Sequence, residues 1–188
     1  MNAREKFLQL IVKVLEDNGI SYMITGSLGA AYYGEPRATN DIDIVVSPNQ
    51  RQLETFISDL GDELYVSPEA AMSALHNKGM FNIIDGMSGW KVDLIILKDR
   101  EFSQVEFGRR RKVPFLSSEY LVVSPEDAIL SKLEWSKIGS SERQFNDAAQ
   151  VAALVGEANI DVTYLKKWAK ELGVEQLLKK LLKGVFGN

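Results

Sequence analysis

The sequence predicts an α/β (α+β) protein: one helix, then intermixed strands and helices, then helices alone. Three observations predict this class. Apolar residues recur at spacings of three and four in residues 3–18, as on one side of a helix. Short runs rich in β-branched and aromatic residues alternate with helix and turn signals as far as residue 123. From Ser124 onward only the helical spacing recurs, so we expect a core over 1–123 and a C-terminal helical subdomain over 124–188 that packs on it.

The first predicted helix covers residues 3–18 and ends at Gly19, a favourable C-cap. A strand is expected at 20–25, followed by the break Gly26-Ser27 and a short helix that ends at residue 34. Residues 35–40 are expected to form a loop before a second strand at 41–46. Ser47 followed by a proline is typical of an N-cap with proline at the first helical position, which predicts a helix at 48–60.

A short helix is predicted at 68–77, and two apolar runs at 80–85 and 90–97 flank the turn sequence GMSG, which predicts a β-hairpin. Residues 99–109 are expected to be helical, and short strands are expected at 113–116 and 120–123. Ser124 and the Pro-Glu-Asp after it start a helix with a variant capping box. Four helices are predicted from there, at 125–137, 141–156, 162–172 and 175–184.

The composition excludes several kinds of site. The 188 residues include no cysteine and only one histidine, which excludes disulfide scaffolds, thiolate zinc sites, cysteine nucleophiles and multi-histidine metal sites. The net charge of −4 argues against binding to nucleic acid or membrane by bulk charge. Because the first residues carry charges throughout, unlike a signal peptide, and no apolar run is long enough to span a membrane, we expect a cytoplasmic protein with no membrane partner.

Asp41 and Asp43 are the first candidate catalytic residues. Two residues apart on a strand, they point to the same face, whereas Ile42 and Ile44 point into a core. Two carboxylates so close repel each other unless a cation lies between them, and oxygen ligands of this kind suit Mg²⁺ or Mn²⁺. The alternative is a pair of solvated acids at the start of a strand.

Asp93 lies in the middle of the apolar run WKVDLIIL. An acid within a buried strand is costly unless it is paired or bound to a metal. Together with the two acids of the other strand, it is a candidate third metal ligand. The alternative is a salt bridge to a neighbour such as Lys91, or a place on an exposed edge.

Gly26 and Ser27 join a strand to a short helix upstream of the acids. Glycine lets the backbone approach a ligand closely, and Ser27 can cap a helix whose first N–H groups would bind an anion. The position of the turn predicts a phosphate site beside a metal site. The alternative is an ordinary strand–helix turn with a serine cap.

Three other kinds of D-x-D site fit less well. An EF-hand loop needs glycine at its sixth position and glutamate at its twelfth, where counting from Asp41 gives Val46 and Gln52. Haloacid-dehalogenase-type phosphatases carry their acids at the C-terminal end of an apolar strand, whereas the apolar run here follows the acids. Metal-dependent glycosyltransferases have nucleotide-sugar domains that are normally longer than this chain.

The run GSLGAAYYGEPRATNDIDIVV and the later KVDLIIL resemble the DNA polymerase β-type nucleotidyltransferase superfamily. The form R-x-T-x-D-I-D is similar to its small bacterial members, the minimal nucleotidyltransferases and the AbiE-type toxin nucleotidyltransferases. The C-terminal part is similar to the helical extension of the latter through Pro125, Glu126, Asp127 and Lys132. The resemblance implies a nucleotidyltransferase fold, with a mixed β-sheet flanked by helices.

The resemblance also implies roles for single residues. Gly26 and Ser27 would hold the triphosphate, and Lys132 would reach it from the first C-terminal helix. Asp41, Asp43 and Asp93 would hold two Mg²⁺ (or Mn²⁺) ions, and Asp93 would act as the base toward the acceptor hydroxyl. In the loop before the acids, Arg37 would contact phosphates or anchor the loop on an acid.

The expected function is therefore Mg²⁺-dependent transfer of a nucleoside monophosphate from an NTP, such as ATP, to a hydroxyl. The acceptor would be a tRNA 3′ end, a protein Ser/Thr/Tyr or a small molecule such as an aminoglycoside. The toxin resemblance implies a toxin–antitoxin pair with an antitoxin partner protein. The alternative is a non-catalytic nucleotide-sensing or protein-binding module that keeps the fold.

For the basic run and the tryptophans, we favour structural roles over functional ones. The basic run Arg109 to Lys112 is expected to form mainly a solvated charged face, with contact to a triphosphate or RNA as the alternative. Trp90, Trp135 and Trp168 are expected to pack in the core rather than stack on bases.

Overall fold

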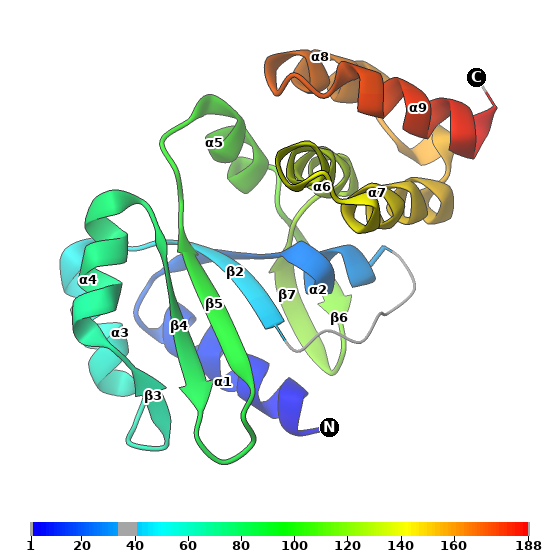
Figure 1. The fold of residues 1–188 in the computed structure, drawn as a ribbon. Coiled ribbons are helices and arrows are strands. Elements are labelled where there is room, and N and C mark those ends of the chain that lie inside the picture. The colour runs from blue at the N-terminus through cyan, green and yellow to red at the C-terminus, as the bar shows by residue number, and fades with distance from the viewer. Residues whose placement is uncertain (1, 34–40, 188) are drawn as a thin grey trace. The chain divides into compact units, whose positions relative to one another are not determined.

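The computed structural model describes residues 2–33 and 41–187. It contains one seven-stranded mixed sheet and separates into two compact units (Figure 1). The first unit takes its described residues from Met1–Leu28 and Ala38–Val122, and the second takes them from Gly29–Arg37 and Val123–Asn188. No helix in the described part of the chain combines the length and apolar character of a membrane span.

The first unit holds all strands of the sheet. Its strands are β1 (Ser21–Thr25), β2 (Asp41–Ser47), β3 (Leu64–Val66), β4 (Met80–Asp85), β5 (Lys91–Ile96), β6 (Arg111–Phe115) and β7 (Ser118–Val122). Its helices are α1 (Ala3–Asp17), α3 (Gln50–Asp59), α4 (Pro68–Asn77) and α5 (Glu101–Gly108). The short helix α2 (Gly26–Ala31) follows β1 directly and crosses from the first unit to the second.

The strand order is β3-β4-β5-β2-β1-β7-β6. The central strand β2 pairs with β1 antiparallel and with β5 in parallel. β4 and β5 form the hairpin that the sequence predicts, and β3 adds a short edge strand. A parallel pair cannot be closed by a tight turn, and β2 and β5 are joined through α3, β3, α4 and β4.

One face of the sheet carries the core of the first unit. Ile42 and Ile44 on β2 and Leu94 on β5 are fully buried on this face, as the alternation of β2 predicts. Helix α3 contacts α1 and α4, α1 contacts β1, and α4 contacts β4 and β5. Figure 1 shows α1 behind the sheet. The opposite face therefore displays the odd-numbered residues of β2 and β5.

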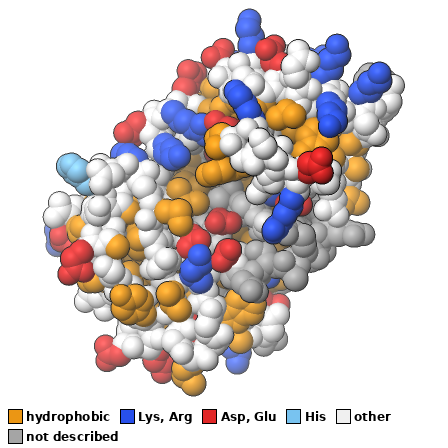
Figure 2. All heavy atoms as spheres, viewed as in Figure 1, with side chains coloured by type: hydrophobic (Ala, Val, Ile, Leu, Met, Phe, Trp, Pro, Cys, Tyr) orange, Lys and Arg blue, Asp and Glu red, His pale blue; other side chains and the backbone are white. Residues whose placement is uncertain are grey.

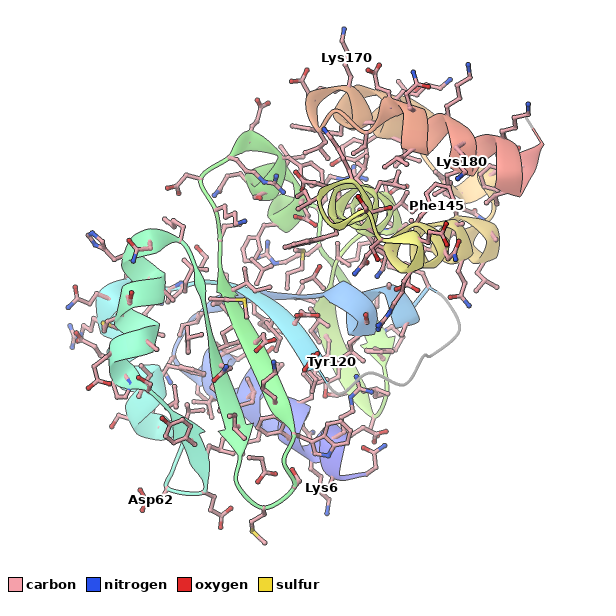
Figure 3. The ribbon with its side chains drawn as sticks, viewed as in Figure 1. Lys6, Asp62, Tyr120, Phe145, Lys170 and Lys180 are labelled. Carbon is pink, nitrogen blue, oxygen red and sulfur yellow. The ribbon has the colours of Figure 1, made fainter. Side chains whose placement is uncertain are left out.

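The second unit is helical. It contains α6 (Pro125–Gly139), α7 (Glu142–Val155), the short 3₁₀ helix η1 (Glu157–Asn159), α8 (Val162–Glu171) and α9 (Glu175–Phe186). α7 packs on α6 and on α9, and α8 packs on α6 and α9. Figure 3 shows Lys180 of α9 close to Phe145 of α7, with the ammonium 4.9 Å from the ring centroid. The four main helices agree with the predicted ones to within two residues at each end.

The structure corrects two of the predictions and adds one strand. The helix expected at 48–60 begins at Gln50, because Asn49 and Gln52 form a reciprocal capping box while Ser47 still pairs in the sheet. Strand β3 was not predicted, because its three residues are too few for an alternating pattern to show. Trp168 is buried as predicted, but Trp135 is 59% exposed on α6, so its assignment to the core is wrong.

Candidate functional site

The three candidate acids lie on adjacent parallel strands and on the same face of the sheet. The register places Asp43 of β2 beside Asp93 of β5, and Asp41 beside Lys91. Residues two apart on a strand share a face, so all four side chains project from the face opposite the core. Figure 2 shows acidic side chains grouped with a basic side chain in the middle of the face that it presents.

The carboxylates differ strongly in exposure. The side chain of Asp41 is 56% exposed, whereas that of Asp93 is 9% exposed. Oδ1 of Asp93 is buried and has no hydrogen-bond partner among the described residues. A buried carboxylate oxygen without a partner loses its hydration and receives nothing in return, which is unusual in a folded protein. This oxygen is the first indication that the site binds a group from outside the chain.

Lys91 supplies the positive charge at the site. Its Nζ lies 3.0 Å from Oδ2 of Asp93 and 3.4 Å from Oδ1 of Asp41. The hydrogen bond to Asp93 raises the pKa of the Lys91 ammonium, although partial burial opposes this rise. Lys91 is therefore a cation at neutral pH. The sequence suggested the pair with Asp93 but not the second pair with Asp41, which follows only from the parallel register.

The donor set suits a hard divalent cation, but the carboxylates do not enclose one in this arrangement. Over residues 2–33 and 41–187, no three His, Cys, Asp or Glu side chains come together closely enough to hold a metal ion. The carboxylates of Asp41 and Asp93 already hold a cation, the Lys91 ammonium, and one oxygen of Asp93 has no partner in the described part of the chain. Carboxylate oxygens are the ligands that Mg²⁺ and Mn²⁺ take. The residues thus fit a divalent ion in chemistry, and the metal assignment stays a prediction.

Gly26 lies directly against Asp43. Its φ is +63°, and a Cβ built on it would overlap the Asp43 carboxylate, at 2.8 Å from Cγ. Both the left-handed backbone and the close approach require glycine here. The glycine-serine turn and the acids therefore meet at the end of β1, where Thr25 pairs with Asp43. Whether Gly26 and Ser27 hold phosphate stays a prediction.

Lys132 and Arg37 are the two other residues predicted to contact phosphate, and for both the contact stays a prediction. Lys132 lies on α6 of the second unit, where its Nζ is 3.1 Å from Oδ2 of Asp147 and 3.3 Å from Oε1 of Gln144. It is 5% exposed, so this ion pair is well shielded from water. Arg37 lies outside the described residues.

The acids of the Pro-Glu-Asp segment join helices of the second unit. Asp127 is fully buried, and its carboxylate accepts hydrogen bonds from the hydroxyls of Tyr164 (2.5 Å) and Ser124 (2.6 Å). Glu126 accepts a hydrogen bond from the backbone N–H of Asp161, just before α8. These contacts hold the start of α6 to the start of α8. They give the segment a structural role.

The basic run at 109–112 also has structural contacts. The guanidinium of Arg110 lies 4.2 Å from the ring centroid of Phe107 and donates to the Phe107 carbonyl. Burial lowers the pKa of Arg110. Lys112 forms an exposed ion pair with Glu119 of the neighbouring strand, at 3.0 Å. The ion pair of Lys112 agrees with the expected solvated face, whereas Arg110 packs against an aromatic ring.

Two solved structures share the fold of this chain. The crystal structure of ANT(2")-Ia in complex with adenylyl-2"-tobramycin matches with a TM-score of 0.56 at 14% identity, over 90% of this chain and 98% of that one. An antigenic nucleotidyltransferase-like protein from Paracoccidioides brasiliensis matches with a TM-score of 0.55 at 15% identity, over 96% of both chains. At these identities the likeness establishes the fold, which is the predicted one: a mixed sheet flanked by helices.

Sequence comparison gives a different result. Residues 14–100 match a family described as "Putative peptidoglycan binding domain". The match covers less than half of the chain, from the end of α1 past β5, and it includes the strands that carry the three acids. No curated protein matches the sequence. The fold assignment therefore rests on the structure and on the resemblance of its motifs.

Proposed function

We propose that the protein is a Mg²⁺-dependent nucleotidyltransferase that moves a nucleoside monophosphate from an NTP to a hydroxyl. One observation carries the proposal: Asp43 and Asp93 lie side by side on parallel strands, with Asp41 on the same face and Gly26 against Asp43. The nucleotidyltransferase fold supports it. A chain without cysteine and with one histidine is compatible with this chemistry, because carboxylates can hold the metal ions and accept the proton.

The reaction assigns a separate task to Asp93. The acceptor oxygen forms a bond to the α-phosphorus, the bond from that phosphorus to the bridging oxygen breaks, and pyrophosphate leaves with the electron pair. The hydroxyl proton passes to the Asp93 carboxylate, whose buried Oδ1 has no other partner among the described residues. Burial excludes competing water from this oxygen, which favours transfer to the acceptor over hydrolysis.

Asp41, Asp43 and Asp93 would hold the two Mg²⁺ (or Mn²⁺) ions expected for this reaction. When bound, such ions lower the pKa of an attacking hydroxyl and stabilise charge on the leaving oxygens. Gly26 would let the triphosphate approach the backbone beside Asp43, since no side chain intervenes. The Ser27 hydroxyl would donate a hydrogen bond to a phosphate oxygen.

The acceptor that we propose is a hydroxyl group, and two observations favour different compounds that carry one. The complex of the related ANT(2")-Ia with adenylyl-2"-tobramycin favours an aminoglycoside. The resemblance to AbiE-type toxins favours a tRNA 3′ end or a protein hydroxyl, together with an antitoxin as partner.

The experiment is a transfer assay with each α-³²P-labelled NTP and Mg²⁺, against tRNA, tobramycin and the protein itself. We expect one NTP and one acceptor to give labelled product, and Asp41→Asn/Asp43→Asn to give none. Asp62→Asn is the matched control, because Asp62 is an exposed acid elsewhere in the first unit (Figure 3). Equal labelling by the double variant would contradict the proposal.

The family match to residues 14–100 favours a second candidate, binding of peptidoglycan without transfer. Sedimentation with insoluble peptidoglycan tests it directly. Binding that persists in Asp41→Asn/Asp43→Asn, with no transfer by the wild-type protein, would support this candidate over the first.

A further inference from the structure

We infer that Lys91 is an internal cation that competes with the metal ion for Asp41 and Asp93, and that it must move before the metal binds. The inference rests on the proposed function, because it concerns how that site acquires its metal. It assigns a role to a residue outside the motifs that suggested the function.

The register of the sheet fixes the position of Lys91. It lies two residues before Asp93 on β5, so the two side chains share a face, and it pairs with Asp41 across the parallel ladder. One ammonium can thus reach a carboxylate along its own strand and another on the next strand. The distances of 3.0 Å and 3.4 Å show that it does both.

This position is one that a divalent ion would need. Asp41 and Asp93 would hold such an ion through carboxylate oxygens, and the ammonium now contacts one oxygen of each. Two cations repel each other at such short range, so both cannot occupy this position. The displacement is feasible, because the Lys91 side chain is 34% exposed and can turn toward water.

The ammonium also explains another feature of the site. By neutralising charge between the strands, it allows acids to lie close together in the protein without metal. It does so incompletely, since Oδ1 of Asp93 has no partner among the described residues.

The test measures Mn²⁺ binding by calorimetry in the full-length protein, with no nucleotide or acceptor. We expect Lys91→Met to bind Mn²⁺ about tenfold more tightly than the wild type, because the competing charge is gone. The matched control is Lys112→Met, which removes the same charge from an exposed ion pair of the same unit and should leave the affinity unchanged. Lys91→Gln is the second variant if Lys91→Met does not fold.

Thermal melting in EDTA provides a second measurement. Lys91→Met should melt below the wild type in EDTA, since Asp93 loses its partner, and saturating Mn²⁺ should remove the difference. Mn²⁺ binding by the wild type with equal or weaker binding by Lys91→Met would overturn the inference and leave the proposed function standing. No Mn²⁺ binding by either protein would contradict the proposed function as well. Binding by Lys91→Met alone would support the inference.

Discussion

Each of the two units contains a buried aspartate, and the two side chains differ in how many of their oxygens have a partner. In the helical unit, both oxygens of Asp127 accept short hydrogen bonds, from Tyr164 and Ser124. In the sheet unit, one oxygen of Asp93 contacts Lys91, and the other has no partner among the described residues. The chain can therefore satisfy a buried carboxylate fully, and at Asp93 it does not.

This difference distinguishes a structural acid from a functional one. A buried carboxylate with a hydrogen-bond donor on each oxygen has recovered much of the hydration that it lost, and it contributes to stability. A partly paired carboxylate costs stability, and such groups are concentrated at functional sites. Both acids are buried, so burial alone does not separate them.

Asp93→Asn gives the largest effect that we expect. It should lower the rate of nucleotidyl transfer at least about 100-fold, because the proton acceptor and a metal ligand are lost. Its free energy of unfolding should change by less than about 1 kcal/mol, since the loss of the ion pair with Lys91 is offset by removal of a buried negative charge. Transfer assays and urea unfolding measure the two quantities. A loss of several kcal/mol in stability would instead make Asp93 a structural ion-pair partner.

Asp127→Ala should show the reverse pattern. Removal of the carboxylate takes a hydrogen-bond acceptor from the buried hydroxyl of Ser124 and from the partly buried hydroxyl of Tyr164, and we expect a loss of about 3 kcal/mol in the free energy of unfolding. Tyr164→Phe should cost about 1 kcal/mol, because only one of these hydrogen bonds is removed. Urea unfolding of both variants measures this. An unchanged stability of Asp127→Ala would remove the contrast between the two acids.

Gly26→Ala tests the contact on the other side of the site. Alanine at φ +63° is strained, and its Cβ would overlap the Asp43 carboxylate, so we expect a loss of about 2 kcal/mol in stability. Gly89→Ala is the matched control, because Gly89 has φ +72° and nothing within 4 Å of a Cβ. It should lose only about 1 kcal/mol, from backbone strain alone. Equal losses in the two variants would mean that Asp43 simply moves away.

Tyr22 is a buried residue of the sheet unit whose hydroxyl has hydrogen-bond partners, and we expect a smaller effect when this hydroxyl is removed. Its hydroxyl lies 3.3 Å from both Oε1 of Glu16 and the backbone nitrogen of Leu121. Burial raises the pKa of Tyr22 to about 12. Because the pKa is raised on folding, its contribution is fully present below the unfolded pKa near 10 and is lost as the pH rises toward 12.

Ionisation of Tyr22 should lower the free energy of unfolding of the wild type by about 1 kcal/mol between pH 8 and pH 10.5. Tyr22→Phe should lack this part of the alkaline loss. Urea unfolding of the two proteins at both pH values measures it. Identical pH dependence in the two proteins would show that Tyr22 ionises as easily in the folded state as in the unfolded chain.

Local patterns were sufficient to predict most elements. The alternation of Asp41, Ile42, Asp43 and Ile44 predicted which residues face the core, and the structure confirms it. The turn sequence predicted the hairpin of β4 and β5. These features depend on neighbours in the chain, which a pattern records.

Features that depend on distant residues were less predictable. β5 pairs with β2 in parallel, and this pairing brings Lys91 to Asp41. The pairing depends on the order of strands that are far apart in the chain. The packing of Gly26 against Asp43 has the same origin. Asp127 was assigned from a motif resemblance, whereas its partner Tyr164 lies on a helix that no local pattern links to it.

The most direct test of the central claim is a melting-temperature screen of the wild type and Asp41→Asn/Asp43→Asn with each NTP, with and without Mg²⁺ or Mn²⁺. A ligand that binds only the folded protein must raise its stability. The account predicts a metal-dependent rise with one NTP in the wild type and none in the double variant. A rise that is independent of metal, or equal in the two proteins, would contradict it.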